Sequence, residues 1–74
     1  MKENVKELIE KYERKIAYRQ SRLESEKRKL ANVTQRYENE EASFESLFNQ
    51  QKNVAIQQDL LFELVEFVED LKNI

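Results

Sequence analysis

Four glutamates near the middle of the sequence are the first side chains that could bind a ligand. Glu38, Glu40, Glu41 and Glu45 lie within eight residues, and their carboxylate oxygens could together hold a divalent cation. Their spacing does not match a calcium-binding loop, and the helical di-iron pattern needs histidine, which the sequence lacks. We therefore expect no metal ion and no other cofactor, and we assign these acids to helix ends and solubility.

Catalytic chemistry finds equally little support in the sequence. The 74 residues include no histidine and no cysteine, so imidazole bases, thiolate nucleophiles and the common zinc ligands are all absent. Serines such as Ser21 and Ser25 therefore have no histidine that could activate them as nucleophiles. We predict a protein that is not an enzyme and has no catalytic residues.

A row of basic side chains in the first half of the chain could bind phosphate groups. Four cations recur every seven residues from 15 to 36, and two more cations and a tyrosine lie on the adjoining side of the same helix. The cations could follow a nucleic-acid backbone while the tyrosine stacks on an unpaired base. Basic rows are more often solvated helix faces, and the net charge of −2 disfavours unspecific nucleic-acid binding, so this function is the alternative hypothesis. The residues concerned are Lys11, Arg14, Lys15, Tyr18, Arg22, Lys29 and Arg36.

The elements that carry these side chains must be long helices. Glycine and proline are absent and 38% of the residues are charged, a composition typical of extended α-helices. Apolar residues recur at alternating steps of four and three, which is the pattern of a coiled-coil seam. In the first half this seam contains Ile9, Ile16 and Leu23, and in the second half it contains Leu61 and Val68. The predicted fold class is all-α.

Charge favours antiparallel packing of the two halves. Residues 1–37 contain eleven Lys and Arg against six Glu, a net charge of +5. Residues 38–74 contain two Lys against nine acids, a net charge of −7, so the halves attract each other when they lie side by side. A fold that sets Glu26 opposite Gln51 also brings apolar seam residues against apolar ones along both helices.

We predict an antiparallel two-helix coiled-coil hairpin that forms a single helical domain over residues 1–74. Helix one is expected over about 4–37, a turn over about 38–40 and helix two over about 41–72, with Asn39 as the N-cap of helix two. The alternative is one continuous helix, about 110 Å long, in an antiparallel dimer. The absence of glycine and the uninterrupted heptad pattern support this alternative.

The second half carries more large apolar side chains than a two-helix seam can cover. In the segment DLLFELVEFVEDL, residues 59–71, leucines and phenylalanines occupy positions well outside the seam. An exposed face of this kind is an aggregation liability, so we expect either a second copy, which would give a four-helix bundle, or a different protein to cover it. The predicted self-association or partner-binding residues are Phe48, Ile56, Leu60, Phe62, Leu64, Phe67 and Leu71.

These patterns favour a small protein–protein interaction module, such as an adaptor, an inhibitor or an assembly factor. We expect a homo-oligomer with a protein partner whose identity the sequence does not indicate. The N-terminal residues lack the apolar stretch of a signal peptide, and no run approaches the roughly 20 apolar residues of a membrane span. A cytoplasmic protein that does not contact a membrane is therefore expected.

Overall fold

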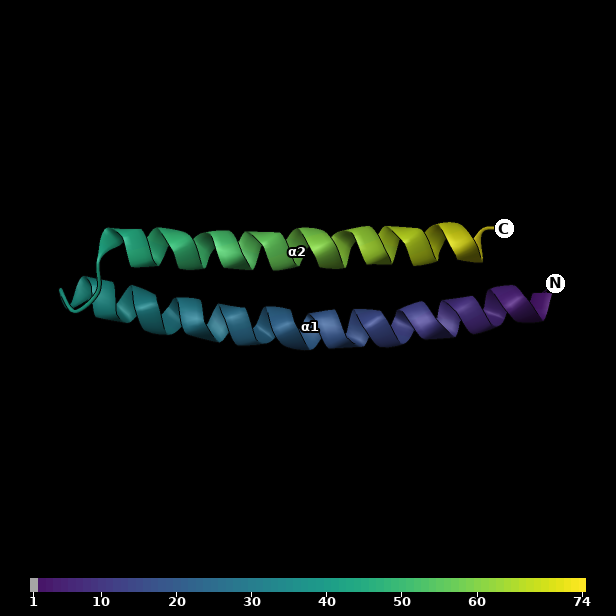
Figure 1. Cartoon of the computed structure of the whole chain (residues 1–74), viewed down its shortest axis with the longest axis horizontal. Helices are drawn as coiled ribbons and strands as arrows, with labels where there is room; N and C mark the ends of the chain where they lie inside the picture. Colours follow the sequence, from purple (N-terminus) through teal and green to yellow (C-terminus); the bar gives the residue numbers. More distant parts are fainter. Residues whose placement is uncertain (1) are drawn as a thin grey trace.

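The computed structural model describes residues 2–74, which form two long helices joined by a short turn (Figure 1). Helix α1 spans Lys2–Glu38 and helix α2 spans Phe44–Lys72. The helices run antiparallel, and the start of α1 lies beside the end of α2, opposite the turn. The predicted all-α fold with two helices packed against each other is confirmed. The alternative of one continuous helix is wrong, because the chain reverses direction at residues 39–43.

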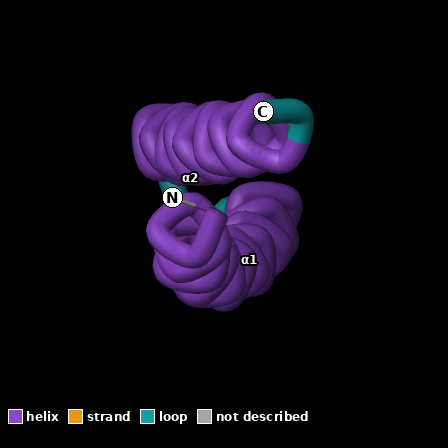
Figure 2. The backbone as a smooth tube through the Cα atoms, turned by 90° about the vertical axis from the view of Figure 1, so that its right-hand side faces the viewer, coloured by secondary structure: helices purple, strands orange, loops and turns teal. Residues whose placement is uncertain are grey.

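The hairpin is long and thin, with extents of 58 × 15 × 12 Å. Figure 2 looks along it and shows the two helices as a single layer, with no third element of the described residues over either broad side. In the part of the chain that the structure describes, neither helix is long and apolar enough to cross a membrane. Every side chain that does not face the other helix is therefore open to solvent or to another molecule.

Helix α1 ends in the hydrogen-bond pattern of a Schellman motif. The amide of Glu41 donates to the carbonyl oxygen of Arg36 at 2.7 Å, and the amide of Glu40 donates to that of Tyr37 at 3.0 Å. Glu40 has a φ of 62°, in the left-handed region that glycine normally occupies at this position. Because the chain contains no glycine, a glutamate takes up this conformation, at a cost of about 1–2 kcal/mol.

Helix α2 begins later than predicted, at Phe44, and its N-cap is Ser43. The Ser43 hydroxyl accepts a hydrogen bond from the amide of Ser46 at 3.1 Å, which satisfies one free donor of the first turn. The predicted cap, Asn39, lies instead in the turn, where its amide donates to the carbonyl oxygen of Gln35. The prediction for Asn39 is wrong because reversing the chain uses residues 39–43 before a new helix can start.

Few side chains are buried, because each helix has only one neighbour. Leu23, Val54 and Val68 are the buried hydrophobic residues in the described part of the chain, with exposed fractions of 6, 9 and 3%. Other seam residues, such as Ile16 and Leu30, are only half-buried. The hairpin therefore has a narrow core with little apolar area removed from water.

The register of α2 differs from the predicted one by a residue. Gln50, rather than Gln51, faces Glu26, and its Nε2 atom donates to the Glu26 side chain across the seam at 2.7 Å. Gln51 and Gln58 are exposed, whereas Gln50 and Gln57 are half-buried. The seam of α2 runs through Leu47, Gln50, Val54, Gln57, Leu61, Leu64, Val68 and Leu71.

Apolar contact at the open end of the hairpin favours this rotation of α2. In the predicted register, the heptad position of Gln51 recurs seven and twenty-one residues later at Gln58 and Lys72, and both are exposed in the structure. The observed register brings Leu64 and Leu71 towards α1 instead, and both are half-buried. Gln50 and Gln57 take the places of Gln51 and Gln58, so the gain comes from Leu71, which leaves water in place of Lys72, at about 25 cal/mol per Å² of apolar area.

Candidate functional site

The predicted interaction residues lie on two sides of α2. Positions three or four apart share a side of a helix, and Ile56, Leu60, Leu64, Phe67 and Leu71 follow one another at such spacings. We call these five residues the apolar stripe. Three of them are half-buried, whereas Ile56 and Phe67 remain 50 and 42% exposed.

Phe48 and Phe62 lie on the other side of α2, together with Phe44. Phe62 precedes Val65 by three residues and Glu69 by seven, and these two line a depression on the opposite side of the hairpin from the apolar stripe. We call Phe44, Phe48 and Phe62 the phenylalanine row. Their exposed fractions are 64, 49 and 62%, and Phe44 contacts α1 through the ring of Tyr37, with the centroids 6.2 Å apart. The predicted interaction residues therefore divide into two separate surfaces, the apolar stripe and the phenylalanine row.

The apolar stripe borders a groove whose other wall is basic. Helix α2 contributes Leu64, and α1 contributes one aromatic and four cationic side chains around a volume of about 550 Å³. No acid lines this groove, which we call the basic groove. Its residues are Lys11, Arg14, Lys15, Tyr18, Arg19 and Leu64.

Tyr12 joins the basic groove and the apolar stripe into one continuous surface. Its ring packs edge-to-face against the ring of Phe67 across the helices, with the centroids 4.9 Å apart. The ammonium group of Lys15 lies 4.8 Å from the centroid of the same Tyr12 ring, within the range of a cation–π contact. A basic band on α1 and an apolar band on α2 therefore run side by side.

The cations of the basic groove are not neutralised by the hairpin itself. The salt bridges among the described residues are Lys29 with Glu26 at 3.6 Å and Lys72 with Glu13 at 3.9 Å. Neither involves a lysine or arginine of the groove. The groove therefore presents concentrated positive charge to any molecule that approaches it.

The predicted nucleic-acid residues are only partly brought together. Lys11, Arg14, Lys15 and Tyr18 line the basic groove, and Tyr18 is 61% exposed. The remaining three cations lie further along α1, outside the groove, and are Arg22, Lys29 and Arg36.

Arg19 is a groove residue that the sequence pattern did not indicate. Its heptad position predicts a place in the seam, and its side chain is half-buried there. The long side chain nevertheless reaches the groove, where the guanidinium lies 6.0 Å from the Tyr18 ring centroid. Arginine can bury its aliphatic stem while its charged end stays exposed. This property could have indicated that Arg19 reaches the groove.

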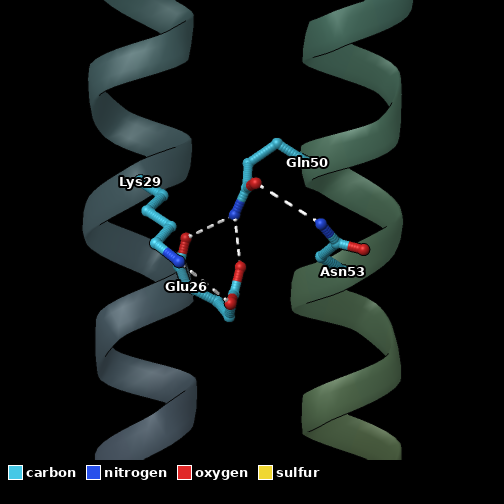
Figure 3. A network of polar contacts seen from close by, with 4 residues as sticks. All are labelled: Glu26, Lys29, Gln50 and Asn53. Atoms are coloured by element: carbon cyan, nitrogen blue, oxygen red, sulfur yellow. Dashed lines mark hydrogen bonds and ion pairs between the residues drawn. The ribbon is translucent and has the colours of Figure 1, made fainter.

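A polar network crosses the seam between the two helices (Figure 3). Nε2 of Gln50 donates to the backbone oxygen of Glu26 at 3.0 Å and to its carboxylate at 2.7 Å, while Lys29 lies 3.6 Å from the other carboxylate oxygen. Nδ2 of Asn53 reaches the Gln50 side-chain oxygen at 3.5 Å. The hydrogen bond from Gln50 lowers the pKa of the Glu26 carboxyl, the charges of Lys29 and Arg22 act in the same direction, and burial opposes them. The network fixes the register of the helices and offers no reactive group.

The acids near the turn do not form a ligand cluster. Among residues 4–74, whose side chains the structure describes, no three acidic side chains lie close enough together to hold a metal ion. Comparison of the chain with known protein families, characterised proteins and solved structures finds no match. The candidate site is therefore the surface that the basic groove and the apolar stripe form together.

Proposed function

We propose that this chain is a small non-enzymatic protein-interaction module, such as an adaptor, an inhibitor or an assembly factor. The observation that carries this proposal is the partly exposed apolar stripe of α2, in which Ile56 and Phe67 are 50 and 42% exposed, beside the unneutralised basic groove of α1. In helix-in-groove recognition, a helix presents apolar side chains spaced by three and four residues to its partner. The stripe of α2 has this spacing. Charged residues along one border of the stripe would orient such a partner.

The narrow core of the hairpin gives a physical reason for a partner. Leu23, Val54 and Val68 are the buried hydrophobic residues of the described chain, and the sequence has no cysteine for a disulfide. Domains of this size usually need a staple, a metal or another chain to become stable. Full burial of a large apolar side chain adds about 1.5–3 kcal/mol, so each partly exposed residue of the stripe would add a fraction of this. We infer that a second hairpin supplies this cover and completes a four-helix bundle.

Affinity capture from a native cell lysate tests the proposed function. The baits are the tagged wild type, the stripe variant Leu60→Ser/Phe67→Ser, and the control variant Gln51→Ser/Gln58→Ser, which alters exposed residues outside the stripe. We expect the wild type and the control to recover one protein near stoichiometry, either the untagged chain or a different protein, and the stripe variant to lose it. Nuclease treatment should leave this recovery unchanged. Equal recovery by the stripe variant would contradict the proposal.

The basic groove with its exposed tyrosine supports nucleic-acid binding as a second candidate function. Four cations and Tyr18 together match the charged track and stacking platform of single-strand binders. Lys11→Glu/Lys15→Glu should then abolish binding to a single-stranded RNA, whereas Lys27→Glu/Arg28→Glu makes the same change of charge outside the groove and should retain most of it. Equal loss in both variants would indicate unspecific attraction, and equal retention would reject this function.

A further inference from the structure

A row of acids lies on α2 directly beyond the apolar stripe. Asp59, Glu63, Glu66 and Asp70 follow one another at spacings of four, three and four, and all four are exposed. At 100° per residue they occupy the side of α2 that comes after the stripe when one moves away from α1. We call them the acid row. None of them forms a salt bridge with another described residue.

One face of the hairpin therefore carries three parallel bands. The basic groove of α1 comes first, the apolar stripe of α2 lies in the middle, and the acid row of α2 follows. The charged bands lie at the same level along the hairpin, because Tyr12 stands beside Phe67 and the groove cations surround Leu64. The acid row, residues 59–70, is thus level with the cations of residues 11–19.

We propose that this face binds the same face of a second copy, related by a two-fold axis parallel to the helices. Such an axis reverses the order of the bands, so the basic groove of each copy meets the acid row of the other and the apolar stripes meet in the centre. A two-fold axis perpendicular to the helices would keep the order and set basic groove against basic groove. Like charges across an interface oppose association, so charge selects the first arrangement. This inference rests on the proposed function and specifies its partner.

In this dimer the two α2 helices run parallel and in register, and each α1 lies antiparallel to the partner's α2. Each residue near the middle of the stripe meets its own counterpart, so Leu60 faces Leu60 of the partner subunit. With the perpendicular axis Leu60 would face the partner's Phe67, and the two copies of Leu60 would be about 10 Å apart along the helices. The two arrangements therefore differ in which side chains a short cross-link can join.

Charge reversal tests the pairing of the bands. Lys11→Glu/Lys15→Glu and, separately, Glu63→Lys/Glu66→Lys each place like charges against each other at both symmetry-related contacts. We expect the dissociation constant from sedimentation equilibrium to rise at least about tenfold for each variant. The chain that carries all four substitutions should return to within about threefold of the wild type, because opposite charges again meet. Lys27→Glu/Arg28→Glu is the matched control for net charge and should leave the constant unchanged.

Cysteine cross-linking tests the direction of the axis, and the natural chain has no cysteine to interfere. Leu60→Cys alone should form a covalent dimer on mild oxidation, because disulfides need Cα atoms about 4.4–6.8 Å apart. A covalent dimer that forms only when Leu60→Cys and Phe67→Cys are mixed would overturn the proposed geometry. Charge-reversal variants that associate like the wild type would overturn it as well.

Different results would reject the dimer and the proposed function. A wild-type chain that stays monomeric, or one whose dimer is lost in Phe48→Ser/Phe62→Ser and kept in Leu60→Ser/Phe67→Ser, rejects the dimer through this face. The proposed function fails only when the stripe variant captures the same proteins as the wild type.

Discussion

Glu26 keeps a carboxylate in the seam, where Gln50 and Lys29 hold it in its charged form. Its pKa in the hairpin lies below the ordinary glutamate value, so the charged form is favoured by folding. The stability that this group contributes is present above the ordinary pKa and is lost as the pH falls through the lower folded value. We therefore expect the melting temperature to fall more on acidification in the wild type than in Glu26→Gln, which cannot titrate.

The measurement is thermal unfolding by circular dichroism between about pH 7 and pH 3 at fixed protein concentration. Glu24→Gln is the matched control, because it removes an exposed carboxylate two residues away that makes no salt bridge with described residues. The control should follow the wild type through the whole titration. Parallel curves for the wild type and Glu26→Gln would show that Glu26 does not contribute to acid sensitivity.

Gln57 is a seam residue with an unpaired acceptor, its side-chain oxygen. Its Oε1 atom is buried and finds no hydrogen-bond donor among the described residues. An unpaired buried acceptor costs about 1–3 kcal/mol, and Gln57 precedes the seam residue Leu64 by seven positions. We expect Gln57→Leu to raise the free energy of unfolding in urea by about 1–3 kcal/mol. Gln58→Leu, at an exposed position, should change it by less than about 0.5 kcal/mol, and a destabilised Gln57→Leu would show that the amide has a partner.

The turn between the helices depends on a strained residue. Glu40 takes the left-handed conformation at the end of α1, and glycine adopts it without the clash of a side chain. We expect Glu40→Gly to raise the free energy of unfolding by about 1 kcal/mol, after the added flexibility of the unfolded chain is subtracted. Glu41→Gly should lower it by about 0.5–1 kcal/mol, since glycine brings only that flexibility at a residue without positive φ. Thermal unfolding of both variants measures the difference, and equal effects would contradict the left-handed turn.

The two helices could be predicted from the sequence, whereas the turn between them could not. The heptad spacing and the absence of glycine and proline are strong local signals, and both helices form where they indicate. The bounds of the turn are not predictable in this way, because its left-handed residue is a glutamate and carries no glycine signature. Asn39 and Ser43 are equally good capping residues by type, and only the path of the chain selects Ser43.

The register of α2 and the arrangement of its surface could not be predicted from the sequence, for a related reason. Helix α2 has apolar residues at adjoining heptad positions, as with Leu64 and Val65, so a pattern of period three and four fits two rotations of the helix. The choice between them decides which side of α2 faces the basic part of α1. The sequence predicts that an apolar surplus exists on α2, but its division into stripe and phenylalanine row follows only from the observed rotation.

The hairpin is 58 Å long and buries few side chains. A molecule that covers one of its broad sides would therefore contribute much of its stability. If a second copy provides that cover, unfolding also separates the copies, and stability becomes dependent on protein concentration. We expect a tenfold increase in concentration to add about 1.4 kcal/mol per dimer to the apparent free energy of unfolding of the wild type. The melting temperature measured over such a series should rise steadily.

Two variants assign this dependence to one side of the molecule. Leu60→Ser/Phe67→Ser removes apolar groups from the stripe and should give a lower melting temperature that no longer changes with concentration. Phe44→Ser/Phe62→Ser makes a similar change in the phenylalanine row, on the opposite side, and should keep the slope of the wild type. A wild-type melting temperature that is constant over the series would mean that the hairpin is stable alone, and the apolar stripe would then be reserved for a different protein.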